Sequence, residues 1–501
     1  MSLLGIDVGT TGTKAVAFNH GGRPIASAYR EYPLHSRQKG WMEVDPHEVA
    51  AAIKDVISLV AAKTRHDPVS ALSVSAMGEA AVPVARDGRF LAPVQVSLDE
   101  RTASYADWWR GRISNEDVFR ITGHTIYSIF TLPRTQWIKE HWRSVYDQTW
   151  KFLCFQEFVF YLLGTEPVTD YSQAARTMGF DVRAKRWSER LFEIAELDPG
   201  KFPVAVQSGT LVGKVADTVA NELGLPRGVK CVTGGHDQPC NALGAGILTG
   251  GSAVYGTGTV DCITPAFDHF VDSTDFIQNN LACYPHVVPD KYCSVAYNST
   301  GGNLLKWYRD TFADTEKRLA AEKGIDPYEV ILSDLPDGPS PVMVLPHFTV
   351  TGTPWFDTNS RGALLGLKLT TTKGEIVKAL IEGTTFEMKL NLEALRRSDV
   401  AVERIRSTGG GAKSRLWNQL KADTLGVPVA TLQTSEGGSL GTAMLAGVAT
   451  GVYGSLAEAA SALIHEHEVF EPRPEVSTRY SERFAIYRQL YPTLREINHR
   501  L

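Results

Sequence analysis

The sequence predicts an α/β protein with two related domains, and three observations lead to this fold class. The chain has 501 residues, which is too long for one hydrophobic core and fits two domains of ordinary size. Segments with the patterns of strands and of helices alternate along it. A strand, a turn of glycine and threonine and a second strand occur near the N-terminus and again about half a chain later. We therefore predict domains of residues 1–246 and 247–501 that face one another.

The composition is that of an ordinary globular protein that binds a small molecule. Lys and Arg number 51 against 56 acids, so the net charge is −5, and no basic block suggests nucleic acid. No run approaches the roughly twenty apolar residues of a membrane-spanning helix, and we expect a cytoplasmic protein without a membrane partner. The six cysteines form no CxxC pair, which favours buried, idle thiols over a zinc or redox site.

The N-terminal elements follow from local patterns. Residues 3–8 and 14–19 read as two strands joined by the turn "GTTGT", and Asp7 is an acid inside the first of them. Residues 46–63 form a clear amphipathic helix, in which Asp45 is the cap, Pro46 fits the first turn and Glu48 would complete a capping box. The segment "VSALSVSAM" is the next predicted strand.

The stretch "VKCVTGGHDQPCNALGAGIL" reads as a strand, a tight glycine turn and a helix. It places Asp237 after two glycines and at the N-terminus of the helix, near the positive end of the helix dipole. Such a position would expose the carboxylate of Asp237, so that it could act in catalysis. The alternative is that Asp237 only caps the helix.

In the second half, "GSAVYGTGTVDCITP" repeats the strand, turn and strand, and a long helix is predicted over residues 372–396. The strand "RIRSTGG" then leads through Gly409 to Gly411 into a helix over residues 414–425, where a flat ligand could lie against backbone. Turns of glycine and threonine can direct N–H groups and hydroxyls at a phosphate. Neither GxxxxGK[ST] nor GxGxxG is present, so ordinary hairpin turns and close helix packing remain alternatives.

Charged residues follow two other predicted strands, Glu79 in "SAMGEAAVPV" and Asp99, Glu100 and Arg101 in "VSLDERT". Open α/β sheets bind ligands at the carboxyl ends of strands. Carboxylates accept hydrogen bonds from hydroxyls, so this cluster suits a polyhydroxylated substrate. Solvated loop charges are the alternative.

Seven segments in order closely resemble the FGGY carbohydrate kinase family, along nearly the whole chain. They are "GIDVGTTGTKAV", "GWMEVDP", "TDYSQAARTMGFD", "GGHDQ", "YGTGT", the pair "LPHFTVTGTPWFDTNSRGALLGL" and "KALIEGTTFEM", and "TGGGAKSRLWNQLKAD". The resemblance implies the actin/hexokinase-like ATPase fold, which is ribonuclease H-like, with a cleft between two domains. It also implies an ATP-dependent transfer of phosphate to a sugar or polyol hydroxyl.

The resemblance also implies roles for individual residues. Asp237 would be the base that accepts the hydroxyl proton, and Asp7 would lie near Mg²⁺ through water. The residues implied around the ATP phosphates are Thr10, Thr11, Thr13, Gly258 and Thr259, and those bordering the adenosine are Gly410, Gly411 and Asn418. The residues implied at substrate hydroxyls are Glu79, Asp99, Asp237 and Gln238.

The substrate is less clearly indicated. Xylulose kinases of the family carry Met-His after this strand and glycerol kinases carry Arg-Glu, whereas this chain has Met77-Gly78-Glu79. We expect a ketopentose such as xylulose, or a tetritol or pentitol, and a homodimer. An actin-like or chaperone-type ATPase that acts on a protein partner is the alternative function, since it would share both turns.

Overall fold

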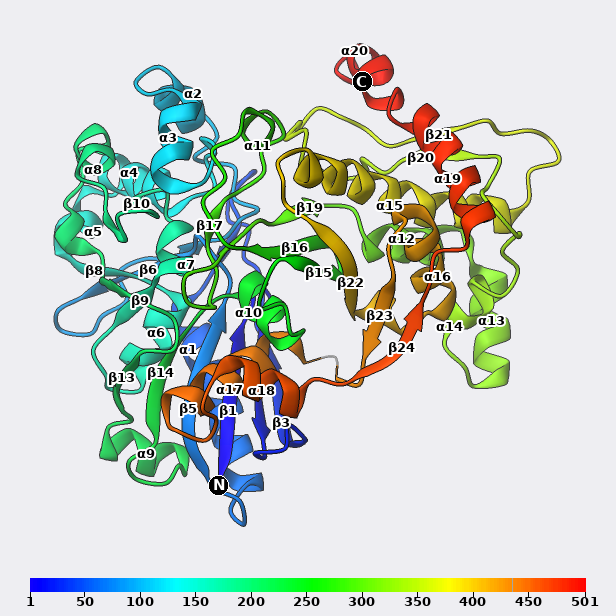
Figure 1. Ribbon diagram of the computed structural model, residues 1–501. Coiled ribbons are helices and arrows are strands. Elements are labelled where there is room, and N and C mark those ends of the chain that lie inside the picture. The colour runs from blue at the N-terminus through cyan, green and yellow to red at the C-terminus, as the bar shows by residue number, and fades with distance from the viewer. Residues whose placement is uncertain (435) are drawn as a thin grey trace.

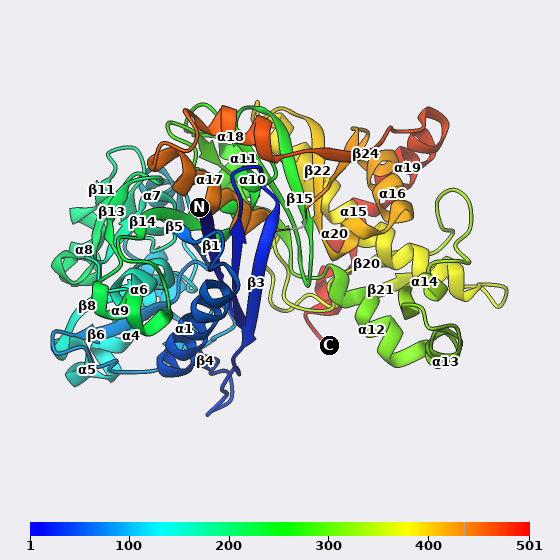
Figure 2. The same cartoon turned by 90° about the horizontal axis from the view of Figure 1, so that it is seen from below.

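The computed structural model describes residues 1–434 and 436–501 and consists of two halves, each built around a mixed β-sheet (Figures 1 and 2). The blue and cyan segments lie in the N-terminal half, and most of the yellow and orange segments lie in the other (Figure 1). Both views place the halves side by side.

The N-terminal sheet is a hairpin meander continued by parallel strands. In spatial order its strands are β13 (Leu211–Lys214), β14 (Lys230–His236), β5 (Val69–Ala76), β1 (Ser2–Val8), β2 (Gly12–Phe18) and β3 (Pro24–Glu31). The pairs β1–β2 and β2–β3 are antiparallel, whereas β5 is parallel to β1 and β14 is parallel to β5. Strand β1 is buried almost throughout because it lies in the middle of a sheet that is covered on both faces.

The C-terminal sheet repeats this plan. In spatial order its strands are β17 (Tyr284–Pro285), β18 (Tyr292–Cys293), β16 (Asp261–Phe267), β15 (Gly251–Thr257), β22 (Val402–Gly409), β23 (Val429–Leu432) and β24 (Glu466–Phe470), and β19 (Ala296–Asn298) also pairs with β16. Here β15 is antiparallel to β16 and parallel to β22, which is parallel to β23. The predicted repeat and the two-domain α/β fold class are confirmed.

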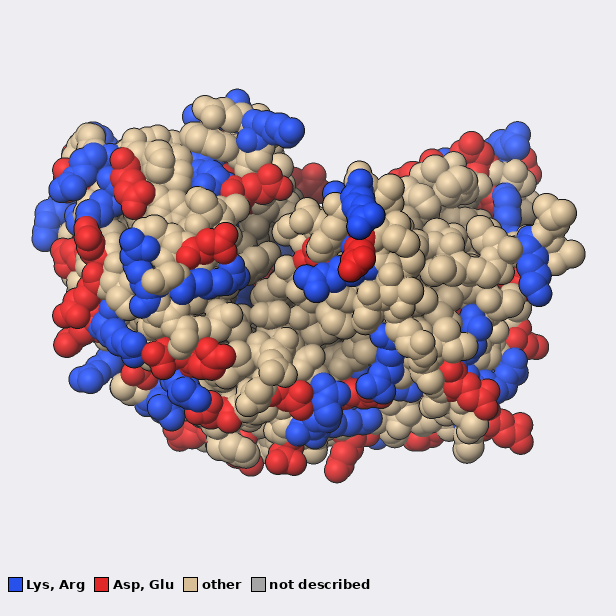
Figure 3. Space-filling model, turned by 90° about the horizontal axis from the view of Figure 1, so that it is seen from above, with Lys and Arg blue, Asp and Glu red and all other residues tan. Residues whose placement is uncertain are grey.

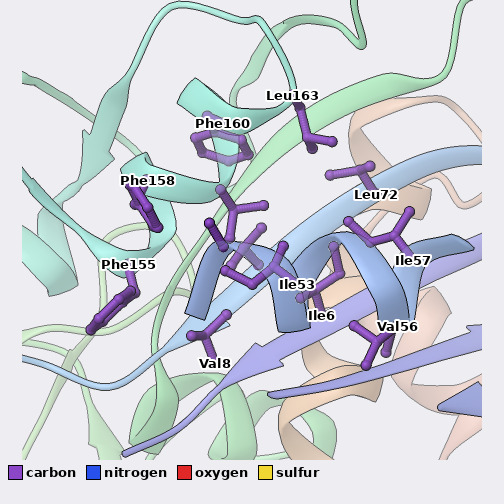
Figure 4. Packing of buried hydrophobic residues seen from close by; sticks show 14 of the residues in the cluster. Ile6, Val8, Ile53, Val56, Ile57, Leu72, Phe155, Phe158, Phe160 and Leu163 are labelled. Carbon is purple, nitrogen blue, oxygen red and sulfur yellow. The ribbon is translucent and has the colours of Figure 1, made fainter. Parts of the chain in front are cut away.

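Helices α1 (Pro46–Lys63) and α6 (Phe155–Leu162) cover one face of the N-terminal sheet. Figure 4 shows their apolar side chains packed against those of β1 and β5. The predicted cap is confirmed, because the Asp45 side chain accepts a hydrogen bond from the N–H of His47. The predicted capping box is wrong, because the Glu48 carboxylate lies 2.9 Å from Nε2 of His35 instead.

The other face of this sheet is covered by α10 (Asp237–Gly244) and by α17 (Gly437–Ala449), which comes from the C-terminal part of the chain. Leu440 and Met444 of α17 belong to the same buried cluster as residues of β1 and β14. On its opposite side, α10 packs against β15 and β16. Helix α10 therefore lies between the two sheets, and its first residue is Asp237.

Two long helices of the C-terminal half follow the predicted bounds closely. Helix α15 (Lys373–Arg397) begins with a capping box between Thr372 and Glu375, and its apolar side packs on β15 and β22. Helix α16 (Arg415–Leu425) is capped by Ser414 and follows the short 3₁₀ helix η2 (Gly410–Lys413). Both helices were predicted from the sequence within about two residues of these bounds.

The remaining elements form insertions around the two sheets. Small strand pairs are β4 (Glu43–Val44) with β7 (Val94–Gln95), β6 (Ala81–Ala85) with β8 (Thr149–Cys154), β9 (Val168–Asp170) with β12 (Val204–Val206), β10 (Phe180–Asp181) with β11 (Arg186–Trp187), and β20 (Met343–Leu345) with β21 (Ala363–Leu365). The other helices are α2 (Tyr105–Arg110), α3 (Asn115–Thr122), α4 (Thr131–His141), α5 (Arg143–Gln148), α7 (Tyr171–Ala175), α8 (Glu189–Ala195), η1 (Pro199–Lys201), α9 (Asp217–Leu223), α11 (Thr274–Gln278), α12 (Gly302–Phe312), α13 (Asp314–Lys323), α14 (Pro327–Ile331), α18 (Leu456–Leu463), α19 (Pro474–Tyr487) and α20 (Leu490–Asn498). Among the described residues, no helix combines the length and hydropathy needed to cross a membrane. All six cysteines are buried and unpaired by disulfides, as predicted.

Candidate active site

Three neighbouring cavities follow the junction between the two halves, and the surface seen from above is hollowed there (Figure 3). The first cavity, of about 230 Å³, is lined by Glu79 and Arg176 among others. The second, of about 310 Å³, is lined by Asp7 and by the turn after β15. The third, of about 390 Å³, is lined by Asn418 and by η2 and its neighbours. Adjacent cavities share lining residues, so together they form one continuous cleft.

Asp237 lies where the first and second cavities meet, and both are lined by it and by Gln238. Burial raises the pKa of Asp237 to about 7, and the negative charge of Asp7 adds to this rise. His236 occupies the N-cap position of α10 and Asp237 is the first residue of the helix, so Asp237 is not its cap. An acid with a pKa near 7 at the meeting point of two cavities is suited to accept a proton.

His236 precedes this acid and holds its ring beside it. Nδ1 of His236 lies 2.9 Å from the hydroxyl of Tyr284, which is fully buried. Nε2 lies 3.3 Å from Oδ1 of Asp237 without hydrogen-bond geometry, and in the described part of the chain Oδ1 has no hydrogen-bond partner. Burial lowers the pKa of His236 well below its usual range, so the ring is neutral beside the acid.

Asp7 lies on β1 and lines the second cavity together with Asp237. Its Oδ1 accepts a hydrogen bond of 2.7 Å from Ser75 on the parallel strand β5. Burial raises the pKa of Asp7, although the hydrogen bond from Ser75 opposes this. Among the described residues, no group of three or more His, Cys, Asp and Glu side chains could hold a metal alone. The donor set fits Mg²⁺, which proteins often bind through one or two carboxylates together with substrate phosphates and water.

The first Gly/Thr turn joins β1 to β2, and its three threonines have different surroundings. Thr10 lines the first cavity, and its hydroxyl lies 3.4 Å from the sulfur of Met77. Thr11 is exposed at the tip of the turn. Thr13 is buried on β2, and its hydroxyl donates to the backbone oxygen of Asp7, so it braces the turn and does not face the cleft.

The second Gly/Thr turn joins β15 to β16 and lines the second cavity with Gly258 and Thr259. Two backbone N–H groups at the start of α12 close it from behind, Gly302 to the carbonyl of Gly258 at 2.9 Å and Gly301 to that of Thr259 at 3.2 Å. Backbone N–H groups therefore bind the carbonyl oxygens of Gly258 and Thr259, and the turn presents main chain to the cleft.

The third cavity is bounded by the segment of three glycines and by α16. Asn418 lines it and donates from Nδ2 to the carbonyl of Ala412 at 2.8 Å. Gly409 and Ala412 also line it, whereas Gly410 and Gly411 lie between them and are not among the described residues that line it. Gly409 has φ +80° and a side chain there would clash with the carbonyl of Thr257, so glycine is required.

Glu79 follows β5 at the wall of the first cavity and forms an ion pair with Arg176. Both side chains are largely buried, which contradicts the alternative of solvated loop charges. The ring of Phe130 lies 5.1 Å from the guanidinium carbon of Arg176. This pair places one carboxylate and one guanidinium on the wall of the first cavity.

Asp99 was predicted at substrate hydroxyls, but the structure does not bring it to the cleft. Its carboxylate is occupied by Arg101 at 2.7 Å and by the N–H of Met42. Arg101 is buried as well, pairs with Glu43 and lies 3.6 Å from the centroid of a Trp41 ring. Among the residues described, those lining the first cavity do not include Asp99, so this prediction is corrected to a structural ion pair.

Other cleft residues were not predicted from the sequence. Arg176 lies in the quoted segment "TDYSQAARTMGFD", but its partner is 97 positions away in sequence. Thr408 lines the second and third cavities, and its position directly before the predicted segment Gly409 to Gly411 is a signal that could have found it.

Two sheets of the same core topology that enclose a cleft, with an acid at its centre and Gly/Thr turns along it, are the arrangement of the actin/hexokinase-like fold. The chain belongs to the FGGY family of carbohydrate kinases, because the N-terminal domain of that family matches residues 2–244 and the C-terminal domain matches residues 251–450. The predicted family and enzyme class are confirmed, and the alternative of an ATPase acting on a protein partner is not retained.

Similar proteins act on different substrates. The xylulose kinase of Bacillus subtilis (strain 168) is 27% identical over 498 residues, covering 99% of this chain and 98% of that one. A glycerol kinase of Ralstonia nicotianae is 29% identical, covering 91% of each chain. A crystal structure of gluconate kinase from Lactobacillus acidophilus superposes with a TM-score of 0.89 at 24% identity, covering 98% of each chain, which shows the shared fold. The chain is thus an ATP-dependent carbohydrate kinase.

Proposed function

We propose that this kinase transfers the γ-phosphoryl group of ATP to a hydroxyl of a ketopentose such as xylulose, or of a tetritol or pentitol, with Asp237 as general base. The observation that carries the proposal is the position of Asp237, shared between a cavity lined by the Glu79–Arg176 ion pair and a cavity lined by a Gly/Thr turn. A hydroxyl in the first cavity would face a phosphoryl group in the second, within reach of this carboxylate.

Phosphoryl transfer passes through a loose transition state, so positioning and charge stabilisation supply most of the catalysis. Backbone around Gly258 and Thr259 would hold the phosphates, and Asn418 would border the adenosine in the third cavity. Mg²⁺, when bound near Asp7, supplies positive charge to the phosphate oxygens. Asp237 would take the proton of the hydroxyl as it attacks. Closure of the two halves would exclude water, the competing nucleophile.

The charge of the first cavity favours a neutral substrate. Among the described residues that line it, the ionisable side chains are the acids Glu79 and Asp237, the single cation Arg176, the histidines His124 and His236, and the thiol and phenols of Cys262, Tyr127 and Tyr297. Burial lowers the pKa of both histidines well below their usual range, so both are neutral. Arg176 is already paired with Glu79, which leaves no free cation among the described lining residues for the carboxylate of an aldonate. A ketose or polyol offers hydroxyls that can donate hydrogen bonds to the carboxylate of Glu79.

A substrate screen tests this proposal directly. ADP release is measured with ketopentoses, tetritols, pentitols, aldonates and glycerol, and NMR of the product locates the phosphate. We expect the highest kcat/KM with a neutral ketopentose, tetritol or pentitol. An aldonate as the best substrate would refute the charge argument, and ADP release that no sugar or polyol stimulates would refute the proposed function.

The substitution Glu79→Gln tests the role of the acid in recognition. It removes the negative charge of the side chain and keeps an oxygen that can accept a hydrogen bond from Arg176, which loses its counter-charge but not its acceptor. We expect the sugar KM to rise by about tenfold, equivalent to about one hydrogen bond to a charged group. The KM for ATP serves as the internal control and should stay within about twofold. An unchanged sugar KM would limit Glu79 to a structural ion pair.

A further inference from the structure

A buried lysine lies directly behind the second Gly/Thr turn. Lys421 of α16 is 0% exposed, although an unpaired buried ammonium is very costly. Its Nζ donates to Oγ1 of Thr257 at 2.7 Å and to Oγ of Ser407 at 3.2 Å. It also lies 4.1 Å from the ring centroid of Tyr255. One side chain thus joins the ends of the parallel strands β15 and β22.

The charge of Lys421 is balanced by Asp261, the first residue of β16. Asp261 is fully buried and pairs with Thr257 across the β15–β16 hairpin. Its Oδ2 accepts a hydrogen bond of 2.9 Å from Tyr255. Burial lowers the pKa of Lys421 to about 8, and the attraction of Asp261 opposes this. Lys421 and Asp261 thus place one basic and one acidic group beneath a turn that itself carries no charge.

Thr257 is the residue at which the two predicted nucleotide segments meet. It precedes the second turn and lines the second cavity. It also pairs with Gly409 in the β15–β22 register. Side chains added at Gly409 and Gly411 would lie 2.4 and 2.5 Å from atoms of Thr257, so both glycines pack against it. Any movement of Thr257 would move the phosphate turn and the glycine segment relative to each other.

We propose that Lys421 is a positioning residue for the nucleotide, which holds Thr257 so that the second turn and the glycine segment bind one ATP molecule together. Its ammonium group also supplies a buried positive charge behind the turn, on the side away from the phosphates. This inference rests on the proposed placement of ATP in the second and third cavities. It does not depend on Asp237 being the base or on the identity of the sugar.

The test compares Lys421→Met with wild type by calorimetric titration with ADP and by steady-state kinetics. Methionine approximates the length of lysine and removes both the charge and the donors. We expect the Kd for ADP and the KM for ATP to rise by about tenfold, while the sugar KM changes by less than about twofold. A purely structural role would lower Tm without this separation of the two KM values.

Lys378→Met is the matched control. Lys378 is another largely buried lysine of the same half, where it donates to the carbonyl of Pro336, and it lines none of the three cavities among the described residues. We expect its ADP affinity to equal that of wild type. Equal ADP affinities for Lys421→Met and Lys378→Met would overturn the proposal.

A second pair of variants keeps the test decisive if Lys421→Met folds poorly. Thr257→Ser retains the hydroxyl that accepts a hydrogen bond from Lys421, whereas Thr257→Val loses it, so Thr257→Val should bind ADP about tenfold more weakly than Thr257→Ser. If Thr257→Val binds ADP as tightly as Thr257→Ser, the contact does not position the nucleotide. Loss of turnover in Asp237→Asn with unchanged ADP affinity leaves the inference standing, and wild-type protein that binds no ADP overturns both proposals.

Discussion

The two hairpins that carry the Gly/Thr turns share a topology and differ in where their acids point. In the N-terminal hairpin, Asp7 lines the second cavity and faces Asp237. In the C-terminal hairpin, Asp261 is buried behind the turn with Tyr255 and Lys421. The N-terminal hairpin thus directs a carboxylate into the cleft, where it can attract a metal cation. The C-terminal hairpin presents uncharged backbone N–H groups, which can bind phosphates. The two hairpins therefore share a topology, and the position of one acid in each determines whether the hairpin attracts a cation or a phosphate.

The largest expected effect comes from removing the acid where the first and second cavities meet. Asp237→Asn keeps the size of the side chain and removes its basicity, so we expect kcat to fall by at least about 100-fold. Calorimetric ADP affinity should stay near the wild-type value, since the change leaves the turn after β15 and helix α16, which border the second and third cavities, as they are. Asp290→Asn, a change at an exposed acid outside the cleft, is the control. Near-normal turnover of Asp237→Asn would remove it from the role of base.

The same variant has a stability consequence with a defined sign. The pKa of Asp237 is about 7 in the folded chain and near 4 when unfolded, so ionisation opposes folding above about pH 4, and the cost is complete above pH 7. Asp237→Asn should therefore have a higher Tm than wild type at pH 8 and a similar Tm near pH 4. A lower Tm at pH 8 would contradict the desolvation of this carboxyl.

Substitutions of Asp7 and Asp261 test most directly whether the acids of the two hairpins have different roles. For Asp7→Asn we expect the Mg²⁺ concentration at half-maximal rate to rise about 10- to 100-fold, as for groups that hold a metal through an outer shell. For Asp261→Asn we expect little change in Mg²⁺ dependence and a loss of about 3 kcal/mol in the free energy of unfolding, because Lys421 loses its counter-charge. Mg²⁺ titrations and denaturant unfolding measure the two effects. Equal Mg²⁺ dependence of the two variants would refute the assignment of Asp7.

The sequence was sufficient for features that depend on local patterns and failed where partners are distant. The helix that Asp45 caps, both hairpins and the position of Asp237 follow from residues within a few positions of each other. Asp99 could not be placed, because its pairing with Arg101 depends on the Trp41 ring and on Glu43, which are more than fifty positions away. Local charge patterns do not reveal which charges are buried together.

Thr13 and Lys421 show the same limit in the predicted nucleotide segments. Thr13 is a threonine of the first turn, yet alternation along β2 directs its hydroxyl to the backbone of Asp7. Lys421 follows Asn418 by one helical turn, but its contacts lie on β15 and β22, far away in sequence. Residue types in a motif indicate a binding segment, whereas the face on which each side chain lies requires the sheet register.

The pH dependence of the reaction is expected to reflect the ionisation of Asp237, which lies in the N-terminal half. Below about pH 7 the Asp237 carboxyl is protonated and cannot accept a proton, so kcat/KM for the sugar should fall about tenfold per pH unit and level off above pH 7. Rates are measured with saturating ATP and Mg²⁺, and ADP affinity at each pH is the control. A rate that is constant from pH 5.5 to 7.5 would show that the pKa of the base is not raised.

The smallest expected effect concerns how each turn is held. The hydroxyl of the buried Tyr32 donates to the carbonyl oxygens of Gly9 and Gly12, whereas the second turn is closed by backbone N–H groups of Gly301 and Gly302. Tyr32→Phe should therefore lower the free energy of unfolding by about 1 kcal/mol, the net value of a buried hydrogen bond. It should also raise the KM for ATP by about two- to threefold, a loss of about 0.5 kcal/mol in binding.

The exposed Tyr29 on β3, three residues before Tyr32, provides the control for this change. Tyr29→Phe should leave the free energy of unfolding and the KM for ATP unchanged. A Tyr32→Phe variant with normal stability and normal KM would mean that the first turn keeps its shape without the hydroxyl. In that case the backbone hydrogen bond from the N–H of Gly9 to the carbonyl of Gly12 would be enough to close the first turn, as backbone N–H groups close the second.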